Sequence, residues 1–293
     1  MNFDVWKPPY VEKFDFDQYL YHYTNIDKAL KIINTNSLRF SSINNMNDTS
    51  ESKMKIIFSS DNITNIKEYK EITDRISNYF KECSDIIQLL CFSMDVRLNE
   101  DENEKILNMR DDKAKYYDVS GRGFALPRMW AQYATNNEGV CFIFNKRKLI
   151  KSVEDTIAFI KHGPVEYKKI FDRYYIDENT MDTLNRKILM ISNGTLTLLN
   201  MIQGDNNFMK YNYFEKLDDW KSENEYRIIA LIDNRNLTEP TKINNMSNFL
   251  EGIVIGEKMD VAYEKTIKLL IKNEKMNCEV KRIKFDTRLC KLI

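Results

Sequence analysis

The stretch Trp220-Lys-Ser-Glu-Asn-Glu-Tyr-Arg-Ile-Ile-Ala-Leu-Ile232 runs from a polar segment into an apolar one. Its apolar end has the length of a strand buried in a sheet. Side chains at positions i and i+2 of a strand share one face, so Glu223, Glu225 and Arg227 should project together. This pattern predicts either a pair of held carboxylates or an exposed edge with a Glu–Arg contact. Since neighbouring carboxylates disfavour each other's charge, we expect a raised pKa in one of the two.

Strand and helix patterns alternate along the rest of the chain. Strands are expected over residues 89–93, 140–144, 252–255 and 278–285, and helices over 61–88, 182–201 and 261–271. Thr24 with Asp27, and Asn47-Asp48 with Glu51, have the spacing of capping boxes that open helices. We therefore predict a mixed α/β (α+β) fold with a central mixed or antiparallel sheet and helical insertions. Residues 1–18 are expected to be a lead-in, and residues 19–293 a single domain.

Composition excludes several classes of protein. The 44 basic residues balance the 44 acidic ones, so no global charge attracts nucleic acid or an anionic membrane. No window holds the roughly 18 uninterrupted apolar residues of a membrane-spanning helix. The five cysteines form no C-x-x-C pair, which favours reduced thiols in a cytoplasmic protein. With two histidines and no glycine-rich phosphate loop, we expect neither a zinc site nor a common nucleotide fingerprint.

One of the two histidines lies in a second informative stretch, Leu20-Tyr-His-Tyr-Thr24. Around His22, the side chains of Tyr21, Tyr23 and Thr24 supply aromatic faces and hydroxyl groups. Such a set suits a ligand that carries both rings and sugar hydroxyls. The alternative is a partly buried histidine that is hydrogen-bonded at the end of a strand.

Three further patterns each allow two interpretations. Asp48 and Glu51 could bind a metal through oxygen ligands, although a helix cap accounts for the same residues. Tyr133 lies one helical turn after Trp130, where aromatic side chains serve either the core or a cofactor. Arg39 is expected to face away from its apolar neighbours and could meet a phosphate or a carboxylate.

Several of these motifs together resemble a bacterial family known as domain of unknown function 2971. The resemblance covers about residues 19–257, and we expect a C-terminal helix and strand in the remaining residues 258–293. The motifs that carry the resemblance occur in this order: Leu20-Tyr-His-Tyr-Thr24, Leu38-Arg-Phe-Ser-Ser42, Asn47-Asp48-x-x-Glu51, Cys91-Phe-Ser93, Met129-Trp-Ala-Gln-Tyr-Ala134, Gly139-Val-Cys-Phe, Val165-Glu-Tyr167 and Trp220-x-x-Glu-x-Glu-Tyr-Arg227. Thr49 departs from the family pattern, which tends to have proline there. The family name implies no activity.

A more remote resemblance does imply an activity. An H-x-T near the start and a late E-x-E are similar to the layout of ADP-ribosyltransferases. This resemblance implies an ADP-ribosyltransferase-like core that cleaves the nicotinamide–ribose bond of NAD, with Glu225 as the catalytic carboxylate and Glu223 beside it. It further implies that His22, Tyr23 and Thr24 lie at the NAD site, with Tyr133 stacking on nicotinamide. Tyr23 replaces the glycine found in many such enzymes.

The chemistry would suit these residue types, because cleavage builds positive charge on the sugar and a fixed carboxylate stabilises it without a metal. We accordingly expect a cytoplasmic enzyme that uses NAD, through Glu223, Glu225, His22, Tyr23, Thr24, Arg39 and Tyr133. Its acceptor would be a protein, a nucleic acid or water, and a toxin or phage-defence role would fit. Two alternatives stay open. One is a non-enzymatic ligand-binding or sensor module of a defence or stress system. The other is a metal-dependent hydrolase that uses Asp48, Glu51 and Glu225.

Overall fold

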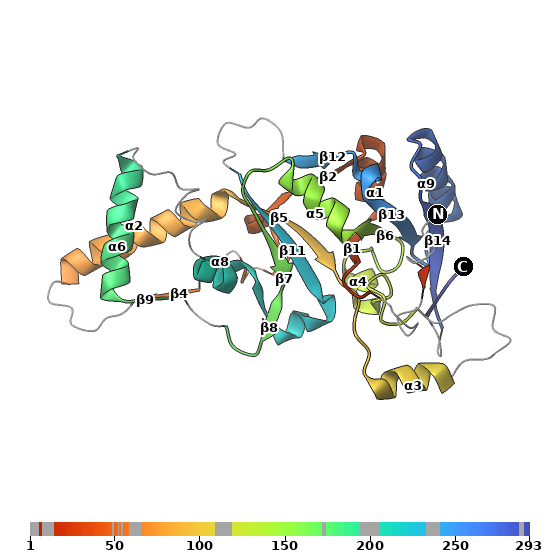
Figure 1. The fold of residues 1–293 in the computed structure, drawn as a ribbon, viewed down its shortest axis with the longest axis horizontal. Coiled ribbons are helices and arrows are strands. Elements are labelled where there is room, and N and C mark those ends of the chain that lie inside the picture. The colour runs from red at the N-terminus through yellow and green to blue at the C-terminus, as the bar shows by residue number, and fades with distance from the viewer. Residues whose placement is uncertain are drawn as a thin grey trace.

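A nine-stranded sheet forms the centre of the computed structural model (Figure 1). The structure describes residues 6–7, 15–48, 50–51, 53, 55–58, 66–108, 119–171, 174–193, 206–232, 241–286 and 290–293. The strands of this sheet follow the order β15-β14-β13-β6-β1-β5-β11-β7, and β3 pairs with β5 outside that path. Their bounds are β1 Tyr19–Thr24, β3 Ser41–Ser42, β5 Ile87–Ser93, β6 Val140–Asn145, β7 Ile160–Pro164, β11 Glu225–Leu231, β13 Leu250–Ile255, β14 Glu279–Phe285 and β15 Cys290–Leu292.

The sheet is mixed but mostly antiparallel, as predicted. Within it, only the pairing of β13 with β14 is parallel among the described strands. Three small two-stranded sheets accompany it: β12 Lys242–Asn244 on β2 Ser37–Arg39, β10 Glu215–Leu217 on β8 Glu166–Lys168, and β4 Ile56–Phe58 on β9 Tyr174–Ile176. The last two pairings are parallel, and they bring segments that are distant in the sequence side by side.

Three helices cover one face of the central sheet. Their buried side chains pack on strand residues such as Phe142, Phe144 and Ile228 in a large apolar cluster. Amphipathic helices cover a sheet in this way because each one hides a single apolar stripe. The helices are α1 Ile26–Thr35, α5 Lys146–Glu154 and α9 Val261–Asn273.

The opposite face carries two separate apolar clusters. One contains Trp130 of α4 (Pro127–Gln132) against Tyr21 and Tyr23 of β1. The other joins β5 and β11 to three helices that extend to the left in Figure 1. These helices are α2 Ile66–Asp85, α6 Glu178–Ser192 and α8 Asn206–Tyr213. The strand residues Ser93, Glu225 and Arg227 lie on this same face and belong to neither apolar cluster.

The remaining elements are short. The helix α3 spans Glu100–Asn108, and the 3₁₀ helices are η2 Ile43–Asn45, η3 Asp218–Glu223 and η4 Met246–Asn248. The predicted strands 89–93, 140–144, 252–255 and 278–285 and the helix 261–271 are confirmed as β5, β6, β13, β14 and α9. The helix expected over 182–201 is α6, which begins earlier at Glu178, and residues 194–201 of that prediction lie outside the described residues.

Two predicted helix caps are wrong. The N-cap of α1 is Asn25, whose side chain accepts from the backbone N of Lys28 at 2.9 Å. Thr24 cannot serve there because it is still paired with Val140 in the sheet. Asp48 opens a turn rather than a helix, and its Oδ1 accepts from the backbone N of Ser50 at 2.8 Å. This short turn is what presents Glu51 to the sheet.

Candidate functional site

Five charged side chains from four parts of the chain meet on the face of the sheet between its two apolar clusters. We call them the ionic cluster: Glu51, Lys216, Glu223, Glu225 and Arg227. All five are buried, with at most 5% of any residue exposed. Glu225 and Arg227 come from β11 and share a face as predicted, whereas Glu223 ends η3 and reaches the group from outside the strand. Charged groups are so rarely buried that their partners must be accounted for.

Arg227 holds two carboxylates and one carbonyl oxygen. Its Nε donates to Glu225 Oε1 at 2.7 Å, and its Nη2 donates to Glu225 Oε2 at 3.0 Å. Nη2 also donates to Glu51, and Nη1 donates to the carbonyl oxygen of Tyr213 at 2.7 Å. The planar guanidinium fork suits this two-point contact with a carboxylate. Arg227 therefore fixes the orientation of Glu225 on the strand.

Lys216 of β10 is surrounded by three carboxylates. Its Nζ lies 2.7 Å from Glu223 Oε2, 2.9 Å from Glu225 Oε2 and 3.1 Å from Glu51 Oε1. The ammonium group also lies 5.1 Å from the ring centroid of Trp220. Carboxylates placed in this way could hold a metal ion, but here they share an ammonium group. Among the described residues, no group of three or more His, Cys, Asp or Glu side chains has the geometry to bind a metal.

The cluster determines how the carboxyl group of Glu225 ionises. Burial by itself raises the pKa of Glu225, but Arg227 and Lys216 offset that effect and lower the pKa to about 2. The expectation that the two neighbouring glutamates raise each other's pKa is therefore wrong for Glu225. The reason is that the sequence pattern contains the carboxylates but not the lysine that β10 brings between them.

Two tyrosines complete the hydrogen bonds of the glutamates. The hydroxyl of Tyr133 donates to Glu223 Oε1 at 2.6 Å, and the hydroxyl of Tyr167 accepts from the backbone N of Glu225 at 2.8 Å. Tyr133, expected to stack on a nicotinamide ring, thus lies beside the E-x-E pair through its hydroxyl group. Tyr167 was not among the residues predicted for the site.

The structure does not bring His22 to the same face as Glu225. Tyr21 pairs with Ser93, and Ser93 pairs with Glu225, so these three form one row on one face of the sheet. His22, one residue further along, points to the other face, where its ring packs edge-on against Phe92 at 5.8 Å. Its Nδ1 lies 3.1 Å from the carbonyl oxygen of Cys91. Burial lowers the pKa of His22, which favours the neutral ring.

The other residues predicted to bind NAD are dispersed. The hydroxyl of Tyr23 donates to the carbonyl oxygen of Gly123 at 2.7 Å, and its ring packs edge-on against Trp130. Thr24 is buried at the end of β1. Arg39 is exposed on β2, opposite Lys242 of β12. Of the predicted residues, therefore, the structure joins only Tyr133, Glu223 and Glu225.

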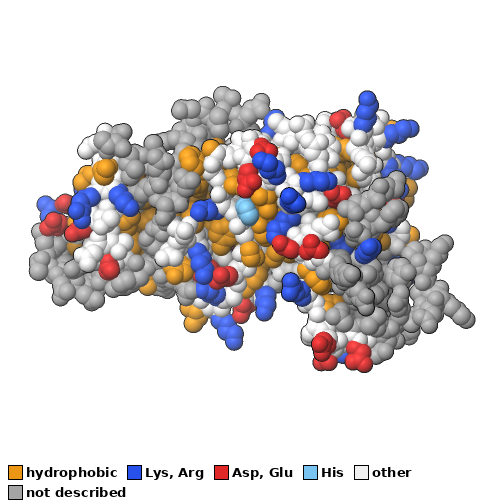
Figure 2. All heavy atoms as spheres, in the orientation of Figure 1, with side chains coloured by type: hydrophobic (Ala, Val, Ile, Leu, Met, Phe, Trp, Pro, Cys, Tyr) orange, Lys and Arg blue, Asp and Glu red, His pale blue; other side chains and the backbone are white. Residues whose placement is uncertain are grey.

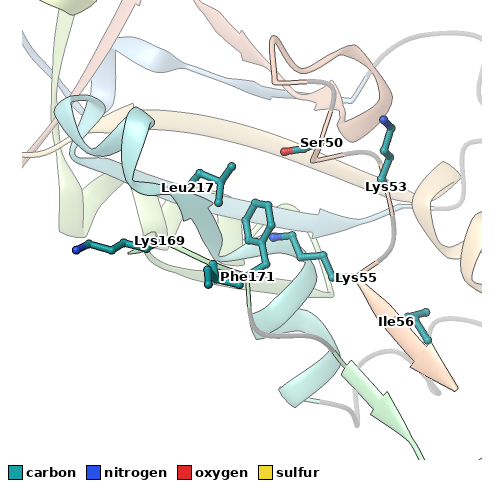
Figure 3. Close-up of a pocket in the computed structure, with 8 residues that line it drawn as sticks. Ser50, Lys53, Lys55, Ile56, Lys169, Phe171 and Leu217 are labelled. Carbon is teal, nitrogen blue, oxygen red and sulfur yellow. The ribbon is translucent and has the colours of Figure 1, made fainter. Parts of the chain in front are cut away.

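An open pocket lies next to the ionic cluster (Figure 3). Its volume is about 470 Å³, within the usual range of small-molecule sites. Among the residues that the structure describes, three lysines and no acidic residue line it. Its lining residues are Ser50, Lys53, Lys55, Ile56, Lys169, Ile170, Phe171 and Leu217.

The same elements build the pocket and the cluster. The turn that presents Glu51 to the cluster continues to Lys55, and β10 carries Lys216 into the cluster and Leu217 into the pocket. The parallel pairing of β10 with β8 places the following residues, including Phe171, on the pocket wall. The pocket was missed in the sequence because its lining comes from three distant segments, none of which contains a recognisable motif.

Lys55 is the most enclosed basic group of the pocket, with 8% of the residue exposed. Its backbone N donates to Asn212 Oδ1 at 2.9 Å, and its Nζ donates to the carbonyl oxygen of Glu215 at 3.0 Å. The Nζ also lies 3.7 Å from the ring centroid of Phe171. Burial lowers the pKa of Lys55 to about 8, further lowered by Arg227 and partly offset by Glu215. At neutral pH this ammonium group is still largely charged.

Comparison with known proteins gives one match, which is to a family model and covers residues 129–228. No curated protein and no solved structure matches the chain. In the part of the chain that the structure describes, no helix has the length and apolar character needed to cross a membrane. The matched segment contains Tyr133, Lys216, Glu223 and Glu225 of the site, but neither His22 nor Lys55. The expected family resemblance is confirmed over residues 129–228, which match the model of a family described as a protein of unknown function (DUF2971).

Proposed function

We propose that this protein is a non-enzymatic binding module that takes a small organic anion into the pocket beside the ionic cluster. The observation that carries the proposal is the charge of the pocket lining, whose described residues include three lysines and no carboxylate. Lys55 supplies a buried positive charge, and Phe171 and Leu217 supply apolar surface for the organic part of the ligand. Pockets of this kind combine a mostly apolar lining with a few placed polar groups.

The attraction of an anion would be local. The chain has a formal net charge of zero, and basic and acidic side chains are interspersed on the face seen in Figure 2. Lys55 would provide the enclosed contact, since its nitrogen lies next to Phe171 in Figure 3. The amines of Lys53 and Lys169 point away from that ring in the same view, and their long flexible side chains would serve a charged group nearer to solvent.

The ionic cluster has a structural role in this proposal. A catalytic Glu225 would have to exchange its contacts with Arg227 and Lys216 for contacts with a ribose. His22, the other end of the expected NAD site, points to the opposite face of the sheet. Cleavage of NAD stays a prediction that rests on the resemblance to ADP-ribosyltransferases. NAD belongs in the binding test all the same, because its diphosphate is an anion.

Thermal unfolding with a panel of anions tests the proposal. The panel holds inorganic phosphate, benzoate and NAD, and the variants are Lys55→Met and, as a matched control, Lys81→Met on the exposed side of α2. An anion at a hundred times its Kd stabilises the folded state by about 2.7 kcal/mol. We expect at least one anion to raise the Tm of the wild type and of Lys81→Met but not that of Lys55→Met. If no anion shifts the Tm of the wild type, or if the Tm of Lys55→Met shifts equally, the binding proposal is refuted.

Release of nicotinamide from NAD, measured in parallel for the wild type and Glu225→Gln, tests the enzymatic alternative. We expect no release from either protein. Turnover by the wild type that is lost in folded Glu225→Gln would replace the binding proposal with the enzymatic one.

A further inference from the structure

The amine of Lys55 differs from the other buried lysine of this region in its partners. Lys216 has three carboxylates within ion-pair distance, whereas Lys55 has none among the described residues. Lys55 instead donates to one carbonyl oxygen and lies over the face of a phenyl ring. Both of these partners are neutral, so they hold the side chain in place and stabilise its positive charge less than a carboxylate would.

The surroundings of Lys55 reduce the free-energy difference between the charged and the neutral form of its amine. Burial disfavours the charged form most strongly, Glu215, Glu51 and Asp48 offset part of that effect, and Arg227 adds to it by repelling the charge. Lys53 and Lys169 line the same pocket. A lysine with a pKa of about 8 is neutral in about a quarter of molecules at pH 7.5, against about one in a thousand for an ordinary lysine. The neutral amine is the nucleophilic form, and desolvation next to other cations is a known way of generating it.

We propose that Lys55 forms an imine with an aldehyde or ketone that also carries an anionic group; this inference rests on the proposed anion-binding role of the pocket. The lone pair of Nζ attacks the carbonyl carbon, the carbonyl oxygen takes up a proton, and the resulting carbinolamine loses water. The product is a C=N bond in place of the C=O bond, and nothing is oxidised or reduced. The pocket is open, so the protons and the released water exchange with solvent.

The lining defines the class of compound. The ring of Phe171 offers a face for a planar group next to the reacting nitrogen. Lys53 and Lys169 offer positive charge to a carboxylate or phosphate at the other end of the molecule. An aromatic aldehyde with a carboxylate meets both requirements, and a keto acid meets the second.

Reductive trapping tests the inference. The protein is incubated with 4-carboxybenzaldehyde and cyanoborohydride at pH 7.5, and the modified lysines are mapped by mass spectrometry of peptides. We expect Lys55 to be modified at least about tenfold faster than exposed Lys81 despite its burial, since the rate follows the neutral fraction. Excess benzoate, which lacks the aldehyde, should slow the modification of Lys55 and not that of Lys81.

The variant Lys55→Arg separates this inference from the binding proposal. It keeps the positive charge, so benzoate should still raise its Tm, but a guanidinium group forms no imine. If benzoate stabilises the wild type while Lys55 reacts no faster than Lys81, the imine inference fails and the binding proposal stands. If benzoate neither stabilises the protein nor slows the reaction of Lys55, both fail.

Discussion

The ionic cluster and the Lys55 pocket lie side by side and share their supporting segments, yet they treat charge in opposite ways. In the cluster every charged group meets an opposite charge, and two cations are held by three carboxylates. In the pocket, the three lysines meet no acidic residue in the part of the lining that the structure describes. The comparison teaches that a buried charged side chain points to a ligand when it has no ion-pair partner within the protein. Burial alone, or a sequence motif alone, does not give that indication.

The two regions should also respond differently to mutation. Removing one member of a compensated buried pair leaves the other charge without a partner, and this destabilises the fold. Removing a pocket lysine that has no carboxylate within ion-pair distance among the described residues should weaken ligand binding and cost the fold less. The following predictions test that contrast, from the largest expected effect to the smallest.

Arg227→Met should have the largest effect. It leaves Glu225 and Glu51 buried without their guanidinium partner, so we expect the free energy of unfolding to fall by about 3–5 kcal/mol. Urea denaturation followed by circular dichroism measures this loss. Lys148→Met is the control, because Lys148 forms an exposed pair with Glu251 and should cost less than about 1 kcal/mol. Equal losses in the two variants would contradict a structural cluster.

Glu225→Gln should cost about 1.5–3 kcal/mol, because a neutral amide replaces a carboxylate that is bound by two cations. It should also change the response to acid. The low pKa of Glu225 contributes stability that is present above about pH 4.3, the usual pKa of glutamate, and is lost as the pH falls through about 2. The wild type should therefore lose more stability than Glu225→Gln between pH 4 and 2. Parallel acid titrations of both proteins measure the difference, and identical slopes would contradict the assignment.

Anion binding should depend on pH in the alkaline range. Lys55 must be protonated to attract an anion, and its pKa without ligand is about 8. The affinity should therefore be constant below that pH and fall about tenfold for each unit above it, until the higher pKa of the complex is reached. Calorimetric titration with benzoate between pH 6.5 and 9.5 tests this. An affinity that stays constant over the whole range would exclude Lys55 as the main contact.

Tyr133→Phe should have the smallest effect. It removes one hydrogen bond to Glu223, which keeps its contact with Lys216, so a loss of about 1 kcal/mol is expected. Because Tyr133 contacts the ionic cluster and does not line the pocket, benzoate affinity should stay within about twofold of the wild type. A loss of binding with unchanged stability would place Tyr133 at a ligand site instead.

The fold was largely predictable from local pattern. Strands that are buried on both faces have continuous apolar sequences, and Val140–Asn145 is such a strand. The contact between Glu225 and Arg227 on one face follows from the alternation of side chains along a strand. What could not be predicted was the register between neighbouring strands, which decides the face of the sheet to which each side chain points. Pairing of Tyr21 with Ser93 puts His22 on the face opposite Glu225, and a shift of one residue would have reversed this.

The pocket was unpredictable for a different reason. Lys55, Phe171 and Leu217 are far apart in the sequence, and two parallel pairings of short strands bring their segments together. Each of these residues is unremarkable in its own segment, and no local motif marks a lysine that has no carboxylate within ion-pair distance among the described residues. The same holds for Lys216, which converts the E-x-E carboxylates from a candidate catalytic pair into part of an ion network.

Calorimetric titration of Lys55→Met and Glu225→Gln with the anion that most stabilises the wild type tests the central claim most directly. Both variants are measured at a temperature at which circular dichroism shows them to be folded. We predict that Lys55→Met binds at least about tenfold more weakly than the wild type, while Glu225→Gln binds within about threefold of it. Loss of binding in Glu225→Gln together with unchanged binding in Lys55→Met would contradict the account.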